Sequence, residues 1–344
     1  MDFKSIRVVL ACSTYCAGVA LLLGLSTAAE AADNKTAQSE KARYGDQQPL
    51  FGRVNVLEGW EITKGDPEVL VGLIDNGYDF FHPDLKGQLI PGYYHAGGFH
   101  TEFFAGNGHG TMISSIIVAK DDNAGMVGLA PHCKVLTASQ GMIEHAPVRL
   151  RREYLHDHPK ATSAEIQVEM QKHRDVMERF GQDWVRYQML GAADAIRYLV
   201  DHGARVINFS STLERSLCPF PDVWRNVEDA FAYAAQEDVV IVLAAGNNAA
   251  KWEGYPGNTD SMLVVGASLL DDTRWEQELE MMGTKIKQGS NYGNRLSVMA
   301  PVDNLMVCVP HEARYYAIKD GPMGPMTLEF RGLHQVHPNG ATSS

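Results

Sequence analysis

An aspartate and a histidine occupy the two positions of this chain that are best suited to acid–base chemistry. Asp75 follows the apolar run of residues 69–74, and His109 lies between Gly108 and Gly110 before a second apolar stretch. A buried carboxylate that orients an imidazole supplies two of the three members of a nucleophilic triad. The third member must be a nucleophile, and the sequence offers Ser343, the last residue but one.

Each of these segments has a simpler interpretation when it is taken alone. An aspartate at a strand end is most often a turn or helix-cap residue, and a histidine in a glycine turn is most often structural. Asn247 presents the same choice, because the apolar run before it ends in Gly-Asn, a common turn signal. In a catalytic role, its amide would donate a hydrogen bond to a developing oxyanion, typically worth about 3–4 kcal/mol.

Apolar runs rich in Val and Ile alternate with amphipathic helices from Phe51 onward. This alternation predicts an α/β fold: a doubly wound, mostly parallel sheet with helices on both faces. Ligands of such sheets bind at the carboxyl ends of the strands, where Asp75 and Asn247 fall. The expected strands are 69–74, 134–138, 205–209, 239–244, 262–267 and 296–299, and the expected helices are 111–119, 192–202 and 223–236.

Three segments of the sequence do not show this alternation of apolar runs and amphipathic helices. Residues 32–50 are polar and alanine-rich, which is typical of a linker before a single domain at 51–344. Residues 143–189 are strongly charged and predict a helical insertion on the surface. Residues 310–338, which contain several prolines and histidines, predict an extended or hairpin excursion.

The N-terminus is typical of an export signal. Lys4 and Arg7 precede the apolar stretch 8–25, and the Ala-Glu-Ala of residues 29–31 fits a small-x-small cleavage site, so residues 1–31 are predicted to be a signal peptide. A membrane anchor is the alternative, because the run is almost long enough to span. We expect a secreted or periplasmic protein with no stable membrane association after cleavage. The net charge of −12 argues against nucleic acid as a partner.

Three cysteines remain beyond the signal, namely Cys133, Cys218 and Cys308. One disulfide with a free thiol and three buried thiols both fit this number. The sequence contains no Cys-x-x-Cys and no His and Cys cluster at metal-ligand spacing. Cysteine catalysis and structural zinc are therefore not expected.

A series of short blocks resembles the subtilisin-like serine proteases. The blocks follow the family's order of acid, histidine and serine, and they run from about Gly59 to the end apart from the two insertions. They are Asp75-Asn-Gly with His82-Pro-Asp-Leu, Gly108-His-Gly-Thr, Gly128-Leu-Ala-Pro, Val206-Ile-Asn-Phe-Ser, Ala244-Ala-Gly-Asn, Tyr255-Pro-Gly with Val264-Val-Gly-Ala, and Val298-Met-Ala-Pro.

The resemblance implies a peptide-bond hydrolase and gives four residues a role. Asp75 would orient His109, which would act as general base and then as general acid. Ser343 would be the nucleophile that forms an acyl-enzyme, because Ala341-Thr-Ser stands where the family has Gly-Thr-Ser. Asn247 would supply the side chain of the oxyanion hole beside the backbone N–H of the nucleophile.

The resemblance also implies the substrate and the metal requirements. The substrate would be a polypeptide, and the chemistry would require no cofactor. Asp84 and Asp122 match positions that bind calcium in some family members, although that ion normally takes 6–8 oxygen ligands. The residues that would line the substrate cleft are Ser210, Ser211, Thr212, Ala244, Ala245 and Gly246.

The sequence departs from the family pattern chiefly at its end. The family continues with a helix after the serine, so this chain is interpreted as truncated, without the C-terminal helix and the elements that follow it. We expect a chain that ends here to be a weak or inactive protease. The alternative is a truncated or degenerate homologue that binds peptides without cleaving them. Retention of Asp75, His109, Asn247 and Ser343 favours the enzyme.

Overall fold

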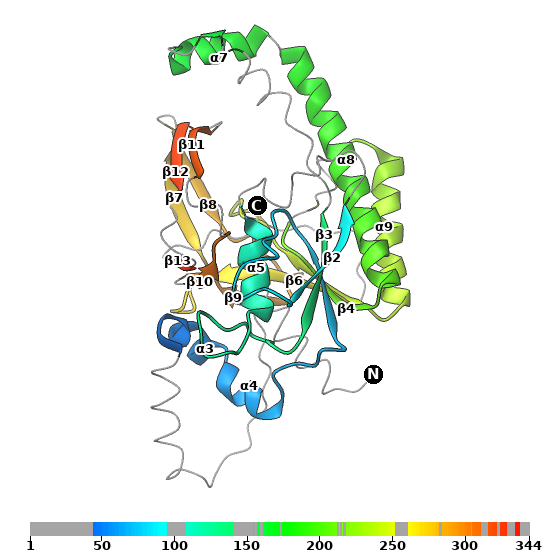
Figure 1. Cartoon of the computed structure of the whole chain (residues 1–344). Coiled ribbons are helices and arrows are strands. Elements are labelled where there is room, and N and C mark those ends of the chain that lie inside the picture. Colours follow the sequence, from blue (N-terminus) through cyan, green and yellow to red (C-terminus); the bar gives the residue numbers. More distant parts are fainter. Residues whose placement is uncertain are drawn as a thin grey trace.

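The structure of the chain is a computed structural model (Figure 1). The model describes residues 44–94, 108–139, 161–172, 174–211, 218–251, 261–281, 284–303 and 305–310, the strands 316–321, 324–328 and 334–337, and a few single residues between 154 and 215. The predicted signal peptide, Thr212 and Ser343 lie outside the described residues. Among the described helices, none combines the length and the apolar character that a membrane crossing requires.

A seven-stranded sheet forms the centre of the fold, with the order β2-β3-β1-β4-β5-β6-β9. Every neighbouring pair in it is parallel. The strands are β1 (Leu70–Ile74), β2 (Leu89–Tyr94), β3 (Lys134–Ser139), β4 (Ala204–Phe209), β5 (Val240–Ala244), β6 (Met262–Ser268) and β9 (Val298–Pro301). This arrangement confirms the predicted doubly wound, parallel fold class.

Helices cover both faces of the sheet, because its strands are apolar on both sides. Leu73 of β1 packs in one cluster with Ile117 of α5 (His109–Val118). The next residue, Ile74, packs in a second cluster below α8 (Arg174–Asp201) and α9 (Pro221–Gln236). Successive side chains of a strand point to opposite faces, so one short apolar run serves both cores.

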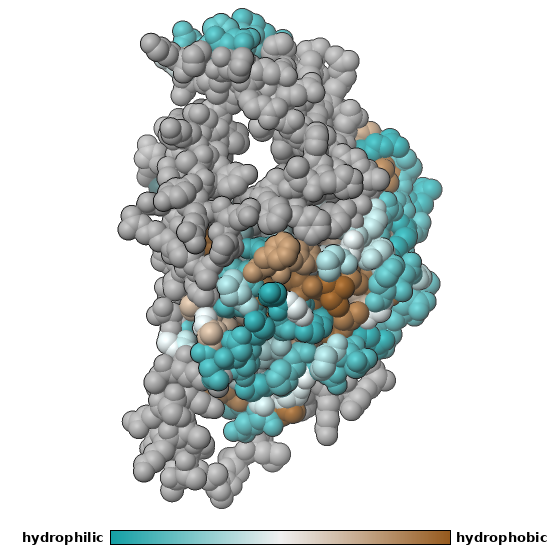
Figure 2. Space-filling model, viewed as in Figure 1, coloured by the Kyte–Doolittle hydropathy of each residue, from teal (hydrophilic) through white to brown (hydrophobic). Residues whose placement is uncertain are grey.

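Helix α9 shows how a single apolar stripe fixes a helix on the sheet. Its buried residues recur at helical spacing, while the charged residues between them stay exposed. Figure 2 shows the resulting hydrophilic outer surface over α9, in teal at the right of the view. The buried residues are Val223, Trp224, Val227, Ala230, Phe231 and Ala234.

The predicted linker 32–50 is wrong at its C-terminal end. Residues 45–47 form a short 3-10 helix, η1, and Gln48–Arg53 form α3, followed by α4 (Val56–Ile62). Tyr44, Leu50 and Phe51 are buried in one cluster, and the buried Gln47 amide donates to the carbonyl of Val127 at 2.8 Å. A few apolar side chains among polar residues suffice to anchor this segment.

The charged region 143–189 contains helix where the structure describes it. Helix α7 (Ser163–Lys172) and the first half of α8 fall within this range. The predicted helix 192–202 is therefore too short, because α8 begins at Arg174 and extends past the end of the sheet (Figure 1). Gly203 follows its end with φ +86°, a conformation that glycine adopts without strain.

Antiparallel pairs accompany the main sheet in the second half of the chain. The predicted excursion 310–338 contains the paired strands β11 (Tyr316–Gly321) and β12 (Gly324–Leu328). Two other pairs escaped the sequence prediction, because their strands are short or strongly polar. They are β7 (Glu276–Met281) with β8 (Thr284–Gly289), and β10 (Leu305–Cys308) with β13 (His334–His337).

A tight turn holds the C-terminal end of α5 against the chain at Gly128. Three backbone hydrogen bonds, led by Gly128 N–H to the carbonyl of Ala119 at 2.9 Å, join residues 128–130 to this end. A Cβ at Gly128 would lie 2.5 Å from the nitrogen of Ala119 and 2.6 Å from that of Val118. Both atoms are backbone and cannot turn aside, so only glycine fits.

We expect Gly128→Ala to destabilise the fold by about 1–3 kcal/mol or more, the usual cost of overpacking a rigid site. The effect is measured as a lower midpoint of urea unfolding. Gly59→Ala is the matched control, since nothing lies within 4 Å of a Cβ there. Gly59 lies inside α4, where alanine should stabilise by about 0.5–1 kcal/mol. Equal midpoints for the two variants would contradict the packing argument.

Candidate active site

Asp75 lies just beyond the carboxyl end of β1, in the middle of the sheet. Its backbone N–H donates to the carbonyl of Ala138 at 3.0 Å, which continues the pairing of β1 with β3 by one residue. The carboxylate is buried, with 6% of the side chain exposed, and its Oδ1 accepts the N–H of Asn76 at 2.7 Å. The strand pairing therefore fixes the backbone of Asp75, and the N–H of Asn76 helps to orient its carboxylate.

His109 is the first residue of α5, and two glycines bring it to Asp75. Gly77 and Gly108 both have positive φ values, +76° and +68°, and a Cβ on Gly77 would lie 3.0 Å from the backbone of Gly108. A Cβ on Gly108 would in turn overlap Pro310. The two segments approach this closely because Gly77 carries no side chain, and Gly108 in the same way leaves room for Pro310.

Hydrogen bonds lock the start of α5 onto the turn after β1. The N–H of Gly110 donates to the carbonyl of Asn76 at 2.8 Å, and the N–H of Thr111 donates to that of Gly77 at 2.9 Å. The Thr111 hydroxyl donates to the same Gly77 carbonyl and accepts the N–H of Asp79. We call this set of bonds the acid–base clasp. Thr111 is a positioning residue that the sequence did not single out.

The imidazole of His109 faces the carboxylate of Asp75. Its Nδ1 lies 2.8 Å from Oδ2 and 2.9 Å from Oδ1. An ionised carboxylate only accepts hydrogen bonds, so Nδ1 carries the proton and Nε2 is the nitrogen that can act as a base. The side chain is 18% exposed, so its surroundings cover most but not all of it.

The pKa of His109 reflects two opposing influences. Burial lowers it, while the charge of Asp75 and the hydrogen bond to that carboxylate raise it, and the net result is a pKa above the ordinary 6.5. Asp75 therefore stabilises the imidazolium that forms whenever His109 takes a proton. This is the electrostatic arrangement that a general base requires.

The candidate oxyanion donor, Asn247, follows β5 in a turn held by a second asparagine. The Asn291 side chain donates to the carbonyl of Ala245 at 2.9 Å and accepts the N–H of Asn248 at 3.0 Å. Its backbone N–H donates to the carbonyl of Gly246 at 2.8 Å. Asn291 is buried and was not recognised from the sequence. It stands in a polar stretch of the sequence, residues 287–295, so nothing there distinguishes it from its neighbours.

The predicted cleft residues lie at the same edge of the sheet as Asp75. In the strand register, Ile74 pairs with Phe209, and Phe209 pairs with Leu243. Because β1, β4 and β5 are adjacent and parallel, the residues that follow these three positions share the carboxyl edge. They are Asp75, then Ser210 and Ser211, and then Ala244, Ala245 and Gly246.

The two carboxylates proposed to bind calcium lie in different surroundings. Asp84 is buried, and its Oδ2 accepts the N–H of Met126 at 2.8 Å and lies 3.8 Å from Sγ of Cys308. Asp122 is exposed and pairs with Lys120 at 3.2 Å. A thiol and an N–H donor beside the carboxylate do not fit a calcium site, which is built from oxygens.

Comparison with known families identifies the family of this chain. The model of the subtilase family matches residues 66–327, which is well over half of the chain. The chain belongs to the subtilase family. The matched region includes Asp75, His109 and Asn247 and ends before Ser343. The family that the sequence blocks suggested is therefore confirmed.

Several subtilases are similar to this chain over most of its length. A thermophilic serine proteinase of Bacillus sp. (strain AK1) is 28% identical over 243 residues, which are 70% of this chain and 46% of that protein. Fervidolysin of Fervidobacterium pennivorans is 31% identical over 215 residues, which are 58% of this chain and 24% of the length of fervidolysin. The matches thus span less than half of these two relatives.

Solved structures show the same fold. The MycP3 protease of the type VII (ESX-3) secretion system aligns with a TM-score of 0.50 at 19% identity. The alignment covers 86% of this chain and 72% of that one. At this identity the likeness supports the subtilase fold alone.

Proposed function

We propose that this subtilase is a serine endopeptidase that hydrolyses polypeptides through Asp75, His109 and Ser343. The observation that carries the proposal is the 2.8 Å contact between His109 Nδ1 and the buried Asp75 carboxylate at the carboxyl edge of the sheet. The contact fixes the tautomer that leaves Nε2 to accept a proton. A degenerate homologue would have no reason to retain it.

The proposed reaction begins with attack on the peptide carbonyl. Nε2 of His109 takes the proton of the Ser343 hydroxyl as Oγ bonds to the carbonyl carbon, and Asp75 stabilises the resulting imidazolium. The carbonyl oxygen becomes an oxyanion, to which the Asn247 amide and the Ser343 N–H donate hydrogen bonds. His109 then gives its proton to the departing amine, which leaves an acyl ester on Ser343.

Water completes the cycle by the same steps in reverse order. His109 removes a proton from the attacking water as the water oxygen bonds to the acyl carbon, and it returns that proton to Ser343 Oγ as the ester bond breaks and the carboxylic acid product leaves. The segments 210–212 and 244–246 would hold the substrate backbone along the cleft. We also propose export of the protein through residues 1–31, which fits a polypeptide substrate outside the cell.

A fluorophosphonate probe tests the nucleophile directly, because it bonds covalently to an activated serine. The purified protein, expressed from its full reading frame, should be labelled at Ser343 and should cleave an internally quenched peptide. Ser343→Ala should lose both labelling and cleavage, whereas Ser344→Ala should keep them. Labelling at another serine, or an unlabelled wild-type protein that is folded, would refute the assignment.

A further inference from the structure

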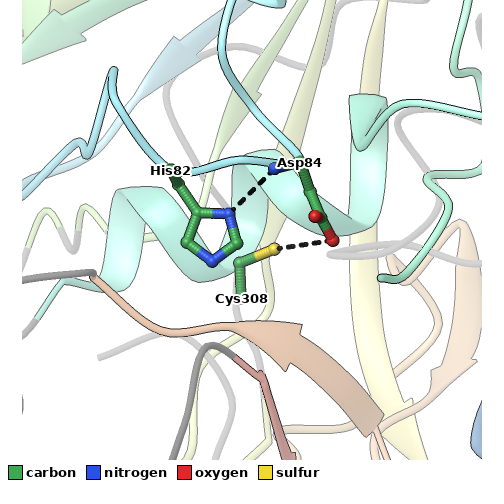
Figure 3. A group of neighbouring side chains, drawn as sticks. All are labelled: His82, Asp84 and Cys308. Atoms are coloured by element: carbon green, nitrogen blue, oxygen red, sulfur yellow. Dashed lines mark hydrogen bonds between the residues drawn. The ribbon is translucent and has the colours of Figure 1, made fainter. Parts of the chain in front are cut away.

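Three buried side chains of different chemistry converge below α5. His82 and Cys308 are fully buried and Asp84 is 5% exposed, and one candidate ligand atom from each lies within 4.8 Å of the others. Figure 3 shows the imidazole, the carboxylate and the thiol meeting at one point. We call this group the His-Asp-Cys cluster. The proposed peptidase reaction makes no use of it.

Segments far apart in the sequence build the cluster. His82 and Asp84 belong to the turn that follows β1, whereas Cys308 is the last residue of β10. The N–H of Cys308 donates to the hydroxyl of Ser115 on α5 at 2.9 Å, which fixes the end of β10 against the helix. The fold therefore brings together three possible metal ligands that are far apart in the sequence.

The cluster places a thiol and a carboxylate together out of water. Burial, and then the charges of Asp84 and Asp79, raise the pKa of Cys308 far above its usual range. The thiol thus stays protonated and lies 3.8 Å from the Asp84 carboxylate. A divalent cation between the two would favour the thiolate instead, because its two positive charges neutralise one carboxylate and one thiolate.

The donor atoms define the class of ion. Sulfur, imidazole nitrogen and a carboxylate oxygen are the ligands of Zn²⁺ and related thiophilic cations, whereas Ca²⁺ and Mg²⁺ take oxygen. We propose that His82, Asp84 and Cys308 form a structural binding site for one zinc-class divalent cation.

The hydrogen bonds of the cluster indicate which contact the ion would replace and which proton would leave. Nδ1 of His82 accepts the N–H of Asp84 at 3.2 Å, the long end of the usual range. A cation bound to Nδ1 would replace this contact and leave the ring neutral, with its proton on Nε2. Asp84 is already a carboxylate. The one proton that must leave on binding is that of the Cys308 thiol.

The location gives the ion a structural purpose near His109. Pro310, two residues beyond Cys308, packs against Gly108, the residue before His109. A cation in the cluster would join the turn after β1 to β10, and β10 is bonded to α5. It would therefore stiffen both segments that position the catalytic pair, without contacting substrate.

Cobalt titration of the full chain tests the site, because Co²⁺ takes zinc ligands and shows a thiolate-to-metal absorption band. After chelator dialysis, the wild-type protein should bind one equivalent through sulfur, release one proton per ion and melt at a higher temperature. Cys308→Ser should lose the band. Cys218→Ser should keep it, since Cys218 is equally buried but packs in the cluster below α8 and α9.

A second variant and a wild-type measurement cover the case in which Cys308→Ser does not fold. Asp84→Asn retains an oxygen for the N–H of Met126 and should weaken cobalt binding by about 10–100-fold or more. In the wild type, the metal should shield Cys308, and not Cys218, from alkylation. A wild-type protein without the sulfur band, or shielding confined to another cysteine, would overturn the proposal.

Discussion

Replacing His109 with alanine is expected to lower kcat for a peptide substrate by about 10⁶-fold, the loss typical of removing the base from a serine-protease triad. The reason is geometric. His109 is the described residue whose imidazole is held by a buried carboxylate, with Nδ1 occupied and Nε2 left to act as the base. Single-turnover cleavage of a quenched peptide measures the effect.

His202→Ala is the matched control for this loss. His202 is exposed, stacks on Tyr198 at 3.8 Å between ring centroids, and immediately follows the last residue of α8. Its removal should leave kcat unchanged. Comparable turnover by the two variants would rule out His109 as the general base, provided that both show the wild-type circular dichroism spectrum.

Asp75→Asn is expected to lower kcat by about 10⁴-fold, with little change in side-chain volume. An amide can donate a hydrogen bond to Nδ1, which would favour the tautomer with its proton on Nε2. The base would then face the serine with the wrong nitrogen protonated. The loss should appear in kcat more than in KM, because Asp75 contacts the imidazole and not the substrate.

The pH profile separates this electrostatic role from a merely structural one. The base must be neutral to work, so kcat/KM should rise with pH through the pKa of His109, which lies above 6.5 in the wild type. Without the Asp75 charge, burial is left to lower that pKa. The acid limb of Asp75→Asn should therefore move to lower pH, and an unchanged limb would contradict the assigned ion pair.

The same ion pair has a defined effect on stability. Because the folded-state pKa of His109 is raised, protonated His109 stabilises the fold below pH 6.5, its ordinary pKa. This contribution is lost as the pH rises through the folded-state pKa. The protein is thus most active where the His109–Asp75 ion pair contributes least to its stability.

The central sheet could be predicted because each of its strands is an apolar run between turns. The run at 69–74 corresponds to β1 and the run at 239–244 to β5, each within one residue at its ends. Strands buried on both faces need continuous apolar residues, which leaves little ambiguity. Helix ends were harder to predict. The N-terminal half of α8 falls in the charged range 143–189, which was predicted as a helical insertion without internal boundaries, so the start of the helix at Arg174 was missed.

Some residues of the site could be predicted from their neighbours in the sequence, whereas the roles of others depend on contacts with distant segments. Asp75 and His109 could be predicted because glycine, acid and histidine stand beside each other in short blocks. The roles of Thr111 and Asn291 could not, because each bonds to backbone atoms of a distant segment. The His-Asp-Cys cluster is the extreme case. Nothing near Cys308 in the sequence indicates that a carboxylate and an imidazole surround it.

The acid–base clasp has a consequence for how this enzyme can change. A side chain on Gly77 would meet the backbone of Gly108, a side chain on Gly108 would meet Pro310, and the bonds of Gly110 and Thr111 end on the same turn that carries Asp75. Neither the acid nor the base can therefore drift alone during evolution. An engineer who wishes to graft the pair elsewhere, or to retune its spacing, must transplant both segments as one part.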